Sequence, residues 1–183
     1  MALAPSDKVM PTESSRDDPL IVSTVHDFLT GHDFRALVDQ HAALNVLLDC
    51  SPALVGRLDF SGVIVHDINL RGRKLRGIAL AGISFIHGNF QKADLTDASL
   101  AAARFEVCDL SGTILDSAVL RDVVIEDSDL TNSRFRKATM TRAKLSNAQL
   151  AAANFEGATG LTADALTQCT TDEYTKLPFD FGD

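Results

Sequence analysis

A five-residue hydrophobic period dominates the middle of the chain. From Phe60 to Phe155 every fifth residue is large and apolar, and the phase holds over twenty consecutive positions. A second set lies two residues before each of these, from Leu58 to Ala153, and from Gly88 onward nearly all its members are small. A period of five fits neither the 3.6 residues of a helical turn nor the two of a strand, so it predicts a repeat architecture.

The period also predicts how the repeat is wound. If one large and one small residue in every five point inward, five residues form one side of a coil. Four such sides close a square, so residues twenty positions apart become vertical neighbours at about the 4.8 Å spacing of adjacent strands. Phe85 and Phe105 are separated in this way, as are Phe135 and Phe155. We therefore expect an all-β solenoid in which large side chains fill the axis and small ones close the corners.

Several five-residue units resemble a known consensus: Ala93-Asp94-Leu95-Thr96-Asp97, Ala98-Ser99-Leu100-Ala101-Ala102, Ala103-Arg104-Phe105-Glu106-Val107 and Ala153-Asn154-Phe155-Glu156-Gly157. They are similar to the A(D/N)LXX repeat of the pentapeptide-repeat proteins, and the resemblance covers about the middle hundred residues. It implies a right-handed quadrilateral β-helix of about five coils, and a bacterial origin. It implies no single activity, because one fold can carry many functions.

The segments on either side of the repeat have other characters. Residues 1–18 are rich in proline, serine and charge, which predicts a disordered tail; the alternative is a secretion signal. Residues 19–56 have helical periodicity and are expected to form a helical cap at the N-terminal end of the 57–160 solenoid; the alternative is a partner-binding module. Residues 161–183 are expected to form a C-terminal cap and tail, with a short helix capped by Thr162.

No motif of the sequence indicates catalysis. No phosphate-binding loop, nucleophile elbow or HExxH motif is present, and Cys50, Cys108 and Cys169 are spaced for neither a zinc site nor a disulfide framework. Cys108 falls in the small inward set and is expected to be a buried thiol in a reducing cytoplasm. We predict no enzyme, no cofactor and no bound metal. No apolar run is long enough for a membrane span, and no secretory signal is expected.

Outward-facing positions provide a candidate interaction surface. Carboxylates gather on two adjacent sides of the coil, and valines occupy positions that normally face solvent. Such a surface suits a protein partner or a homodimer better than acid–base chemistry, because an open wall has no pocket that excludes water. The candidate residues are Glu106, Asp109, Val119, Val124, Glu126, Asp127 and Asp129.

Net charge tests an activity known in the family, DNA mimicry directed at DNA gyrase, with inhibition or quinolone protection. The mimic needs a densely negative rod. The net charge of the chain is −8, to which residues 1–56 contribute −5, residues 57–160 contribute +1 and residues 161–183 contribute −4. The rod is thus nearly neutral. Direct nucleic-acid binding is not expected either, since the basic residues near 134–144 lack interleaved aromatics.

The sequence therefore favours a non-enzymatic, cytoplasmic interaction scaffold built on a rigid solenoid. Two alternatives stay open at this point. One is a DNA-mimic protein that binds gyrase, and the other is a secreted bacterial effector targeted by its solenoid. The partner itself is not indicated by any residue.

Overall fold

A computed structural model describes residues 19–20, 37–50 and 52–178. The expected disordered tail, 1–18, lies outside the described residues, and so do residues 21–36 of the expected helical segment. The chain divides into two compact units, Met1–Leu58 and Asp59–Asp183, and each is described by itself. Whether the first unit is a cap for the second stays a prediction.

The described part of the first unit includes helices α2 and α3. Helix α2 spans Leu37–Leu48 and α3 spans Pro52–Val55. Leu44, Leu47 and Leu48 are buried, at the three- and four-residue intervals of one helical face. The long helix ends at Leu48, and Pro52 stands at the first position of α3, where its missing N–H costs no hydrogen bond.

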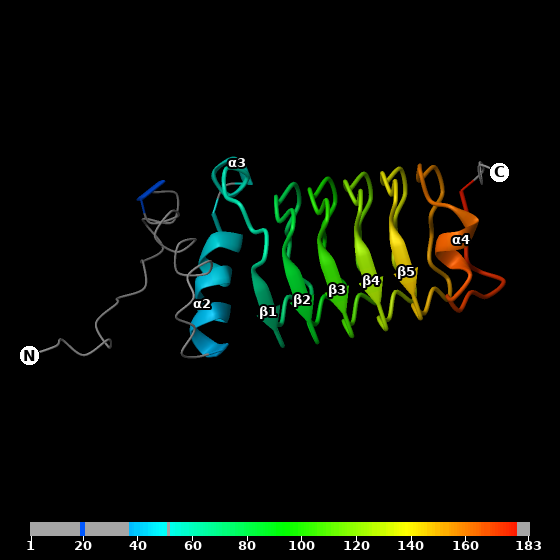
Figure 1. Cartoon of the computed structure of the whole chain (residues 1–183), viewed down its shortest axis with the longest axis horizontal. Coiled ribbons are helices and arrows are strands. Elements are labelled where there is room, and N and C mark those ends of the chain that lie inside the picture. The colour runs from blue at the N-terminus through cyan, green and yellow to red at the C-terminus, as the bar shows by residue number, and fades with distance from the viewer. Residues whose placement is uncertain (1–18, 21–36, 51, 179–183) are drawn as a thin grey trace, which may run out of the picture. The chain divides into compact units, whose positions relative to one another are not determined.

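The second unit is a parallel β-solenoid, the right-handed quadrilateral β-helix that the family resemblance implies. Its first wall is a five-stranded parallel sheet in the order β1-β2-β3-β4-β5 (Figure 1). Each strand pairs with the next at an offset of twenty residues, so that Phe85 lies beside Phe105 and Phe105 beside Ile125. The strands are β1 (Ile64–His66), β2 (Ser84–Ile86), β3 (Arg104–Glu106), β4 (Val124–Glu126) and β5 (Lys144–Ser146).

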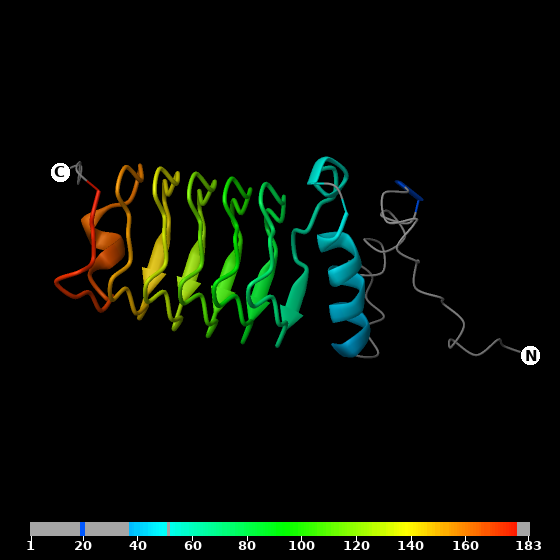
Figure 2. The same cartoon turned by 180° about the vertical axis from the view of Figure 1, so that it is seen from behind.

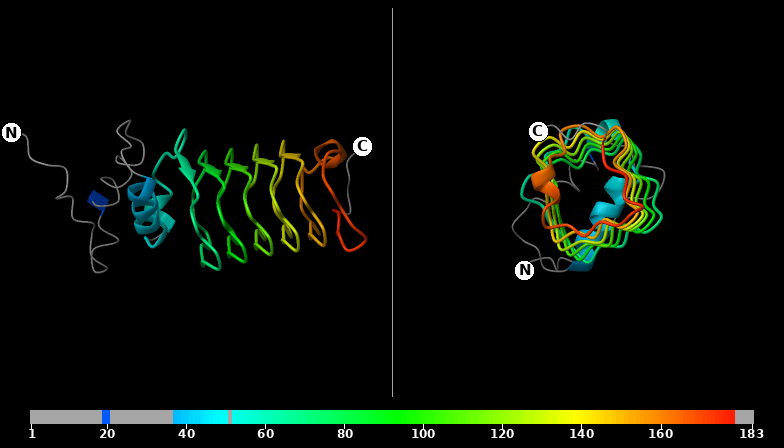
Figure 3. Two further views of the ribbon diagram at one scale, coloured as in Figure 1. Left: turned by 90° about the horizontal axis from the view of Figure 1, so that it is seen from below. Right: turned by 90° about the vertical axis from the view of Figure 1, so that its right-hand side faces the viewer.

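Three further walls are built from single-residue parallel bridges at the same offset. The second wall carries the column Asn69, Asn89, Asp109, Asp129 and Gln149; the third carries Lys74, Asp94, Ile114, Arg134 and Asn154; the fourth carries Ala79, Ser99, Val119, Thr139 and Thr159. Figure 2 shows the side of the solenoid opposite the sheet, and the end-on view in Figure 3 shows successive coils superimposed. From β1 to β5 the chain completes four turns, slightly fewer than the five expected, and the flanking residues add partial turns.

Side chains fill the axis as the period predicts. All twenty large residues from Phe60 to Phe155 are buried. Phe85 stacks on Phe105 with ring centroids 5.4 Å apart, and Phe135 stacks on Phe155 at 4.7 Å. Phe90 contacts both Phe85 and Phe105 edge-to-face, at 4.9 and 5.3 Å. The two pairs predicted to be vertical neighbours are therefore in direct aromatic contact.

The small inward set is also buried, and its polar members are satisfied. Thr113 Oγ1 donates to the Phe90 carbonyl at 2.8 Å, and Ser133 Oγ donates to the Leu130 carbonyl at 2.6 Å. Ser128 Oγ donates to the Glu126 carbonyl at 2.7 Å and accepts from the Cys108 N–H at 3.0 Å. Hydroxyls can therefore replace alanine here without leaving an unpaired polar atom. Arg73, which interrupts this set, is only half-buried.

The corners have one repeated backbone conformation. Every fifth residue from Gly62 to Gly157 has a positive φ, and fourteen of these positions carry a side chain. The left-handed conformation turns the chain through the corner, and glycine, asparagine and aspartate adopt it at the least cost. The period of five thus sets the corners as well as the core.

The C-terminal segment pairs with the last coil of the solenoid. Helix α4 spans Ala163–Leu166 with Thr162 as its N-cap, as expected from the sequence. Thr170 then pairs above Gln149 on the second wall, and Lys176 pairs above Asn154 on the third. Figure 1 shows α4 beyond β5. Within the described residues, no helix has both the length and the hydrophobicity of a membrane span.

Candidate functional site

Most of the candidate residues lie where the first wall meets the second, at the level of β3 and β4. Glu106 and Glu126 are in register on neighbouring strands of the first wall. Asp109 and Asp129 are bridged to each other on the second wall. Asp127 stands at the corner between them, with φ 50°. The structure therefore brings these five carboxylates to one edge of the rod, on the two adjacent walls that the sequence indicates.

Arg104 offsets part of this negative charge. Its Nη2 donates to Glu126 Oε2, and its Nε lies 3.5 Å from Glu106 Oε2. Because one guanidinium spans two stacked carboxylates, repulsion between Glu106 and Glu126 is relieved on the wall itself. Sequence reasoning did not identify this cation as part of the site, although Arg104 lies twenty residues below Val124 and two before Glu106.

Two of the aspartates brace their own corners. Asp109 Oδ1 accepts from the N–H of Ser111 at 2.9 Å and from its hydroxyl at 2.6 Å. Asp129 Oδ1 accepts from the Thr131 N–H at 2.8 Å. The same bond, from a residue two positions later, is made by Asn69, Asn89, Asp94 and Asn154. The Asp or Asn of the A(D/N)LXX unit is thus an Asx-turn residue, and one carboxylate oxygen of Asp109 and of Asp129 is already engaged.

Hydrogen bonding within these turns also affects titration. Burial opposes ionisation of Asp94, but the hydrogen bonds from the Thr96 hydroxyl and N–H and the charge of Arg76 outweigh it, so the pKa of Asp94 is lowered. The Thr96 hydroxyl donates to Asp94 Oδ1 at 2.5 Å. This carboxylate is held in its ionised form by its corner, which is a structural role.

Val107 is an outlier at the same edge. It occupies the corner column formed by Asp67, His87, Val107, Asp127 and Asn147, all with positive φ. Asn, Asp and His are the non-glycine residues that favour this conformation, whereas a β-branched side chain in it is a genuine outlier. Val107 has φ 53° and is 47 % exposed. The sequence pattern places Val107 outside, but only the backbone reveals that it is strained.

The two candidate valines lie on different walls. Val124 belongs to β4, between Arg104 and Lys144 of the neighbouring strands, and is half-buried. Val119 belongs to the fourth wall, bridged to Ser99 and Thr139. The first wall therefore separates Val119 from the carboxylates of the second wall. The seven candidate residues are spread over three walls; the five carboxylates share one edge, and Val124 lies on the first wall two residues before Glu126.

The interior offers little reactive chemistry. Cys50 and Cys108 are buried and Cys169 is half-buried, all as free thiols. Burial raises the pKa of the Cys108 thiol to about 11, and burial also raises the pKa of Cys169. A thiol that stays protonated at neutral pH is a poor nucleophile. Among the described residues, no group of three His, Cys, Asp or Glu side chains is placed to hold a metal ion.

Comparison with known proteins agrees with this geometry. The model of the pentapeptide repeat family matches residues 66–101, 98–136 and 118–157, with eight copies of the repeat. The chain belongs to the pentapeptide repeat family. No curated protein matches its sequence significantly.

Solved structures similar to the chain are pentapeptide-repeat proteins of low identity. A trypsin-treated QnrB1 variant, a plasmid-mediated fluoroquinolone resistance protein, is 15 % identical, with 63 % of this chain and 85 % of that chain covered and a TM-score of 0.31. Rfr23 from the cyanobacterium Cyanothece 51142 is 23 % identical, with coverages of 57 % and 90 % and a TM-score of 0.26. A thylakoid-lumen protein of Arabidopsis thaliana is 18 % identical, with coverages of 52 % and 61 % and a TM-score of 0.27.

Proposed function

We infer that the protein is a non-enzymatic scaffold that binds a protein partner through the edge between its first and second walls. The contact region, here called the edge surface, consists of Glu106, Val107, Asp109, Val124, Glu126, Asp127 and Asp129. Val119 is left out because it lies on the fourth wall. The hydrogen-bonded coils beneath this surface hold its side chains at fixed spacing, so little order has to be gained on binding.

The conformation of Val107 is the observation that carries this proposal. A left-handed backbone costs an ordinary L-residue about 1–2 kcal/mol. The 47 % exposed side chain also leaves apolar surface in water. Both features disfavour valine in the free protein at a corner where the neighbouring coils have His87 and Asp127. Local strain of this kind is concentrated at functional sites, and contact with a partner would bury the valine.

The chemistry of the edge surface defines the complementary partner. Glu106 and Glu126 already share Arg104. Asp127 accepts one hydrogen bond from Asn147 Nδ2 at 3.0 Å, and its side chain is exposed. An apolar side chain on the partner, set among lysine or arginine residues, would match Val107 and the carboxylates around it.

Val107→Asn tests the proposal against a matched control. Asparagine tolerates positive φ, so we expect the variant to fold at least as stably as the wild type. The control is Ala102→Asn, at another exposed corner with φ 57°. Full-length wild-type and variant proteins are used to capture partners from cells that produce the protein. A specific partner is retained by the wild type and by Ala102→Asn, and its Kd for Val107→Asn is at least about tenfold weaker. Equal affinity for Val107→Asn would contradict the assignment of this edge.

Pairing of charges along the rod supports a scaffold over a DNA mimic. Of the twelve acidic residues in 57–160, seven form ion pairs with arginine: Asp94, Asp97, Glu106, Asp116, Asp122, Glu126 and Glu156. A rod neutralised on its own walls has a weak negative field for a DNA-binding enzyme to recognise. We expect no effect on gyrase supercoiling, with or without quinolone, at micromolar protein; inhibition or protection there would favour the mimic.

Location in the cytoplasm is part of the same proposal. The alternative of a secreted effector depends on residues 1–18, which lie outside the described residues. A translocation reporter fused to residues 1–18 separates the two, since a cytoplasmic scaffold leaves the reporter inside the producing cell.

A further inference from the structure

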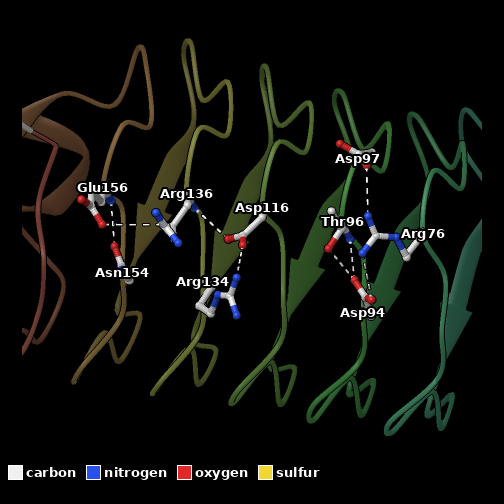
Figure 4. Close-up of polar contacts among 9 residues, drawn as sticks. All are labelled: Arg76, Asp94, Thr96, Asp97, Asp116, Arg134, Arg136, Asn154 and Glu156. Carbon is white, nitrogen blue, oxygen red and sulfur yellow. Dashed lines mark hydrogen bonds and ion pairs between the residues drawn. The ribbon is translucent and has the colours of Figure 1, made fainter.

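The third wall carries charges in bands that change sign along the rod. The five coils are counted here from β1 to β5, each with its own stretch of the third wall. The bands are Lys74 and Arg76 on the first coil, Asp94 and Asp97 on the second, Asp116 on the third, Arg134, Arg136 and Lys137 on the fourth, and Glu156 on the fifth. Figure 4 shows most of these side chains on one wall. We call this set of nine residues the charge ladder.

Ion pairs between neighbouring coils hold the charge ladder in place. Arg76 lies 3.6 Å from Asp94 and 3.5 Å from Asp97, Arg134 pairs with Asp116, and Arg136 lies 3.6 Å from Glu156 (Figure 4). Most of these side chains still face water: Arg76 is 60 % exposed and Asp97 58 %, whereas Asp94 and Asp116 are more covered, at 24 % and 18 %. The exposed charges are therefore fixed in position and open to a second set of contacts.

We propose that the charge ladder is a docking surface for a second copy of this chain. The two copies are related by a two-fold axis that lies between their third walls, level with the third coil and parallel to the strand direction. The two rods then lie antiparallel with their third walls face to face. Each coil then faces the coil equally far on the other side of the third: first against fifth, and second against fourth. This proposal is independent of the edge surface, which lies on other walls.

The charges match under this symmetry position by position, and not only coil by coil. Rotation about an axis across the rod keeps each side chain in its own column, because positions along the strand direction are unchanged. The column before the wall's centre holds Asp94 and Arg134. The column after the centre holds Arg76 and Glu156. The corner column holds Asp97 and Lys137. Each residue of these three pairs would therefore face its opposite in the second copy. Because the interface is isologous, every pair occurs twice.

The third coil provides the centre of the contact. Ile114 is its outward apolar residue, half-buried in the column that also holds Asp94 and Arg134. On the two-fold axis Ile114 meets Ile114 of the second copy, which places an apolar contact in the middle of a charged frame. Asp116 also approaches its own counterpart, but Arg134 of the same chain is paired with it. Repulsion at the axis is thus reduced.

Other arrangements of two copies place like charges together. If the two rods were parallel, each band would face the same band of the second copy, and like charges would meet. A half-coil shift of the axis toward β1 would put the acidic second band beside Asp116, and would set Lys74 against Arg134 and Arg76 against Arg136. A shift of the same size toward the C-terminus would put Asp116 against the basic band, but would set the acidic second and fifth bands against each other. The charge ladder therefore selects one register.

The size of the surface sets the expected strength. Five coils at about 4.8 Å make a contact about 24 Å long, and one wall of the rod is narrower than that. Such an area falls at the small, polar end of specific interfaces. Self-association is therefore expected to be weak, with a Kd in the micromolar range or above, and to weaken with salt because exposed charges are screened.

A charge-exchange cycle at Asp97 and Lys137 tests the proposal. Both residues are exposed corner residues with φ near 60°, and lysine already occupies this conformation at Lys92 and Lys137. Full-length wild type, Asp97→Lys, Lys137→Glu and the double variant are compared by sedimentation equilibrium at low and high salt, with thermal denaturation as the check of folding. Each single variant places like charges opposite each other twice and should weaken self-association about tenfold. The double variant exchanges the two charges and should restore it.

The outcomes separate cleanly. Dimers that weaken with each single variant and recover in the double variant support the proposal. A wild type that stays monomeric up to millimolar concentration overturns it, and so do dimers that are indifferent to all three variants, which would use another surface. Val107→Asn should leave self-association unchanged, so failure of the edge surface and failure of the charge ladder are distinguishable.

Discussion

Truncation of Phe105 gives the sharpest test of the stacked core. The ring is buried against Phe85, at 5.4 Å, and Phe90, at 5.3 Å, which also contact each other. Removal of a buried phenylalanine costs about 3–5 kcal/mol, and each aromatic contact contributes about 0.5–1.5 kcal/mol beyond burial. The backbone around it cannot collapse readily, because the Arg104 N–H is bonded to Ile83 at 2.9 Å and the Val124 N–H to Ala103 at 3.0 Å. We expect Phe105→Ala to lower the free energy of unfolding by about 4–5 kcal/mol.

The measurement is equilibrium denaturation in guanidinium chloride followed by circular dichroism, with coincidence of a second probe as the test of two-state unfolding. Phe105→Leu is the matched control, because it keeps most of the volume and removes only the ring contacts, at a cost of about 1–1.5 kcal/mol. Equal losses for the two variants, or a loss under about 1 kcal/mol for Phe105→Ala, would refute the reasoning, since the ring would then not be part of a rigid stack.

Three further predictions concern the tail, the thiols and the first wall. Hydrogen bonds from the Ala152 and Tyr174 N–H groups and the Thr175 hydroxyl lower the pKa of Asp172 below its ordinary 3.8. A lowered pKa in the folded protein stabilises it at pH values above the ordinary pKa, and this stabilisation is lost as the pH falls below about 4. Tyr174 is the single tyrosine of a chain without tryptophan, so its fluorescence reports on this segment. The fluorescence should change in that pH range in the wild type and not in Asp172→Asn. Cys108, with its raised pKa, should react with a thiol reagent only after unfolding, and rapid reaction in the native protein would contradict its burial. Arg104→Ala should cost only about 0.2–1 kcal/mol in denaturant, as exposed ion pairs do, and a larger loss would show that Arg104 supports the sheet in another way.

Much of the fold could be predicted because one physical rule repeats along the chain. Leu95 and Leu115 are buried for the same reason as Phe85 and Phe105: each holds the central position of its group of five, which points toward the axis. The rule also fixes the twenty-residue register of the strands. It stops at residue 160, where α4 and the bridged residues Thr170 and Lys176 follow no five-residue period. Their place depends on pairing with the last coil, which local pattern does not encode.

The candidate site was less predictable, because its properties depend on side-chain and backbone geometry. The sequence places Glu106 and Glu126 outside, but not the guanidinium of Arg104 across both. It suggests Asp109 as part of a negative surface, whereas one of its oxygens braces a turn. It identifies Val107 as outward-facing, whereas the positive φ that makes it unusual exists only in three dimensions.

The pairing of the tail with the last coil has a consequence for polymerisation. Leu150 and Phe155 donate their N–H groups to the carbonyls of Thr170 and Lys176, each at 2.7 Å. These partners occupy the backbone groups to which a coil of another molecule would otherwise bond, and uncovered strand edges are templates for fibre growth. Residues 161–178 therefore act as a terminator at this end, and a chain shortened to residue 160 should self-associate through the uncovered backbone groups of its last coil.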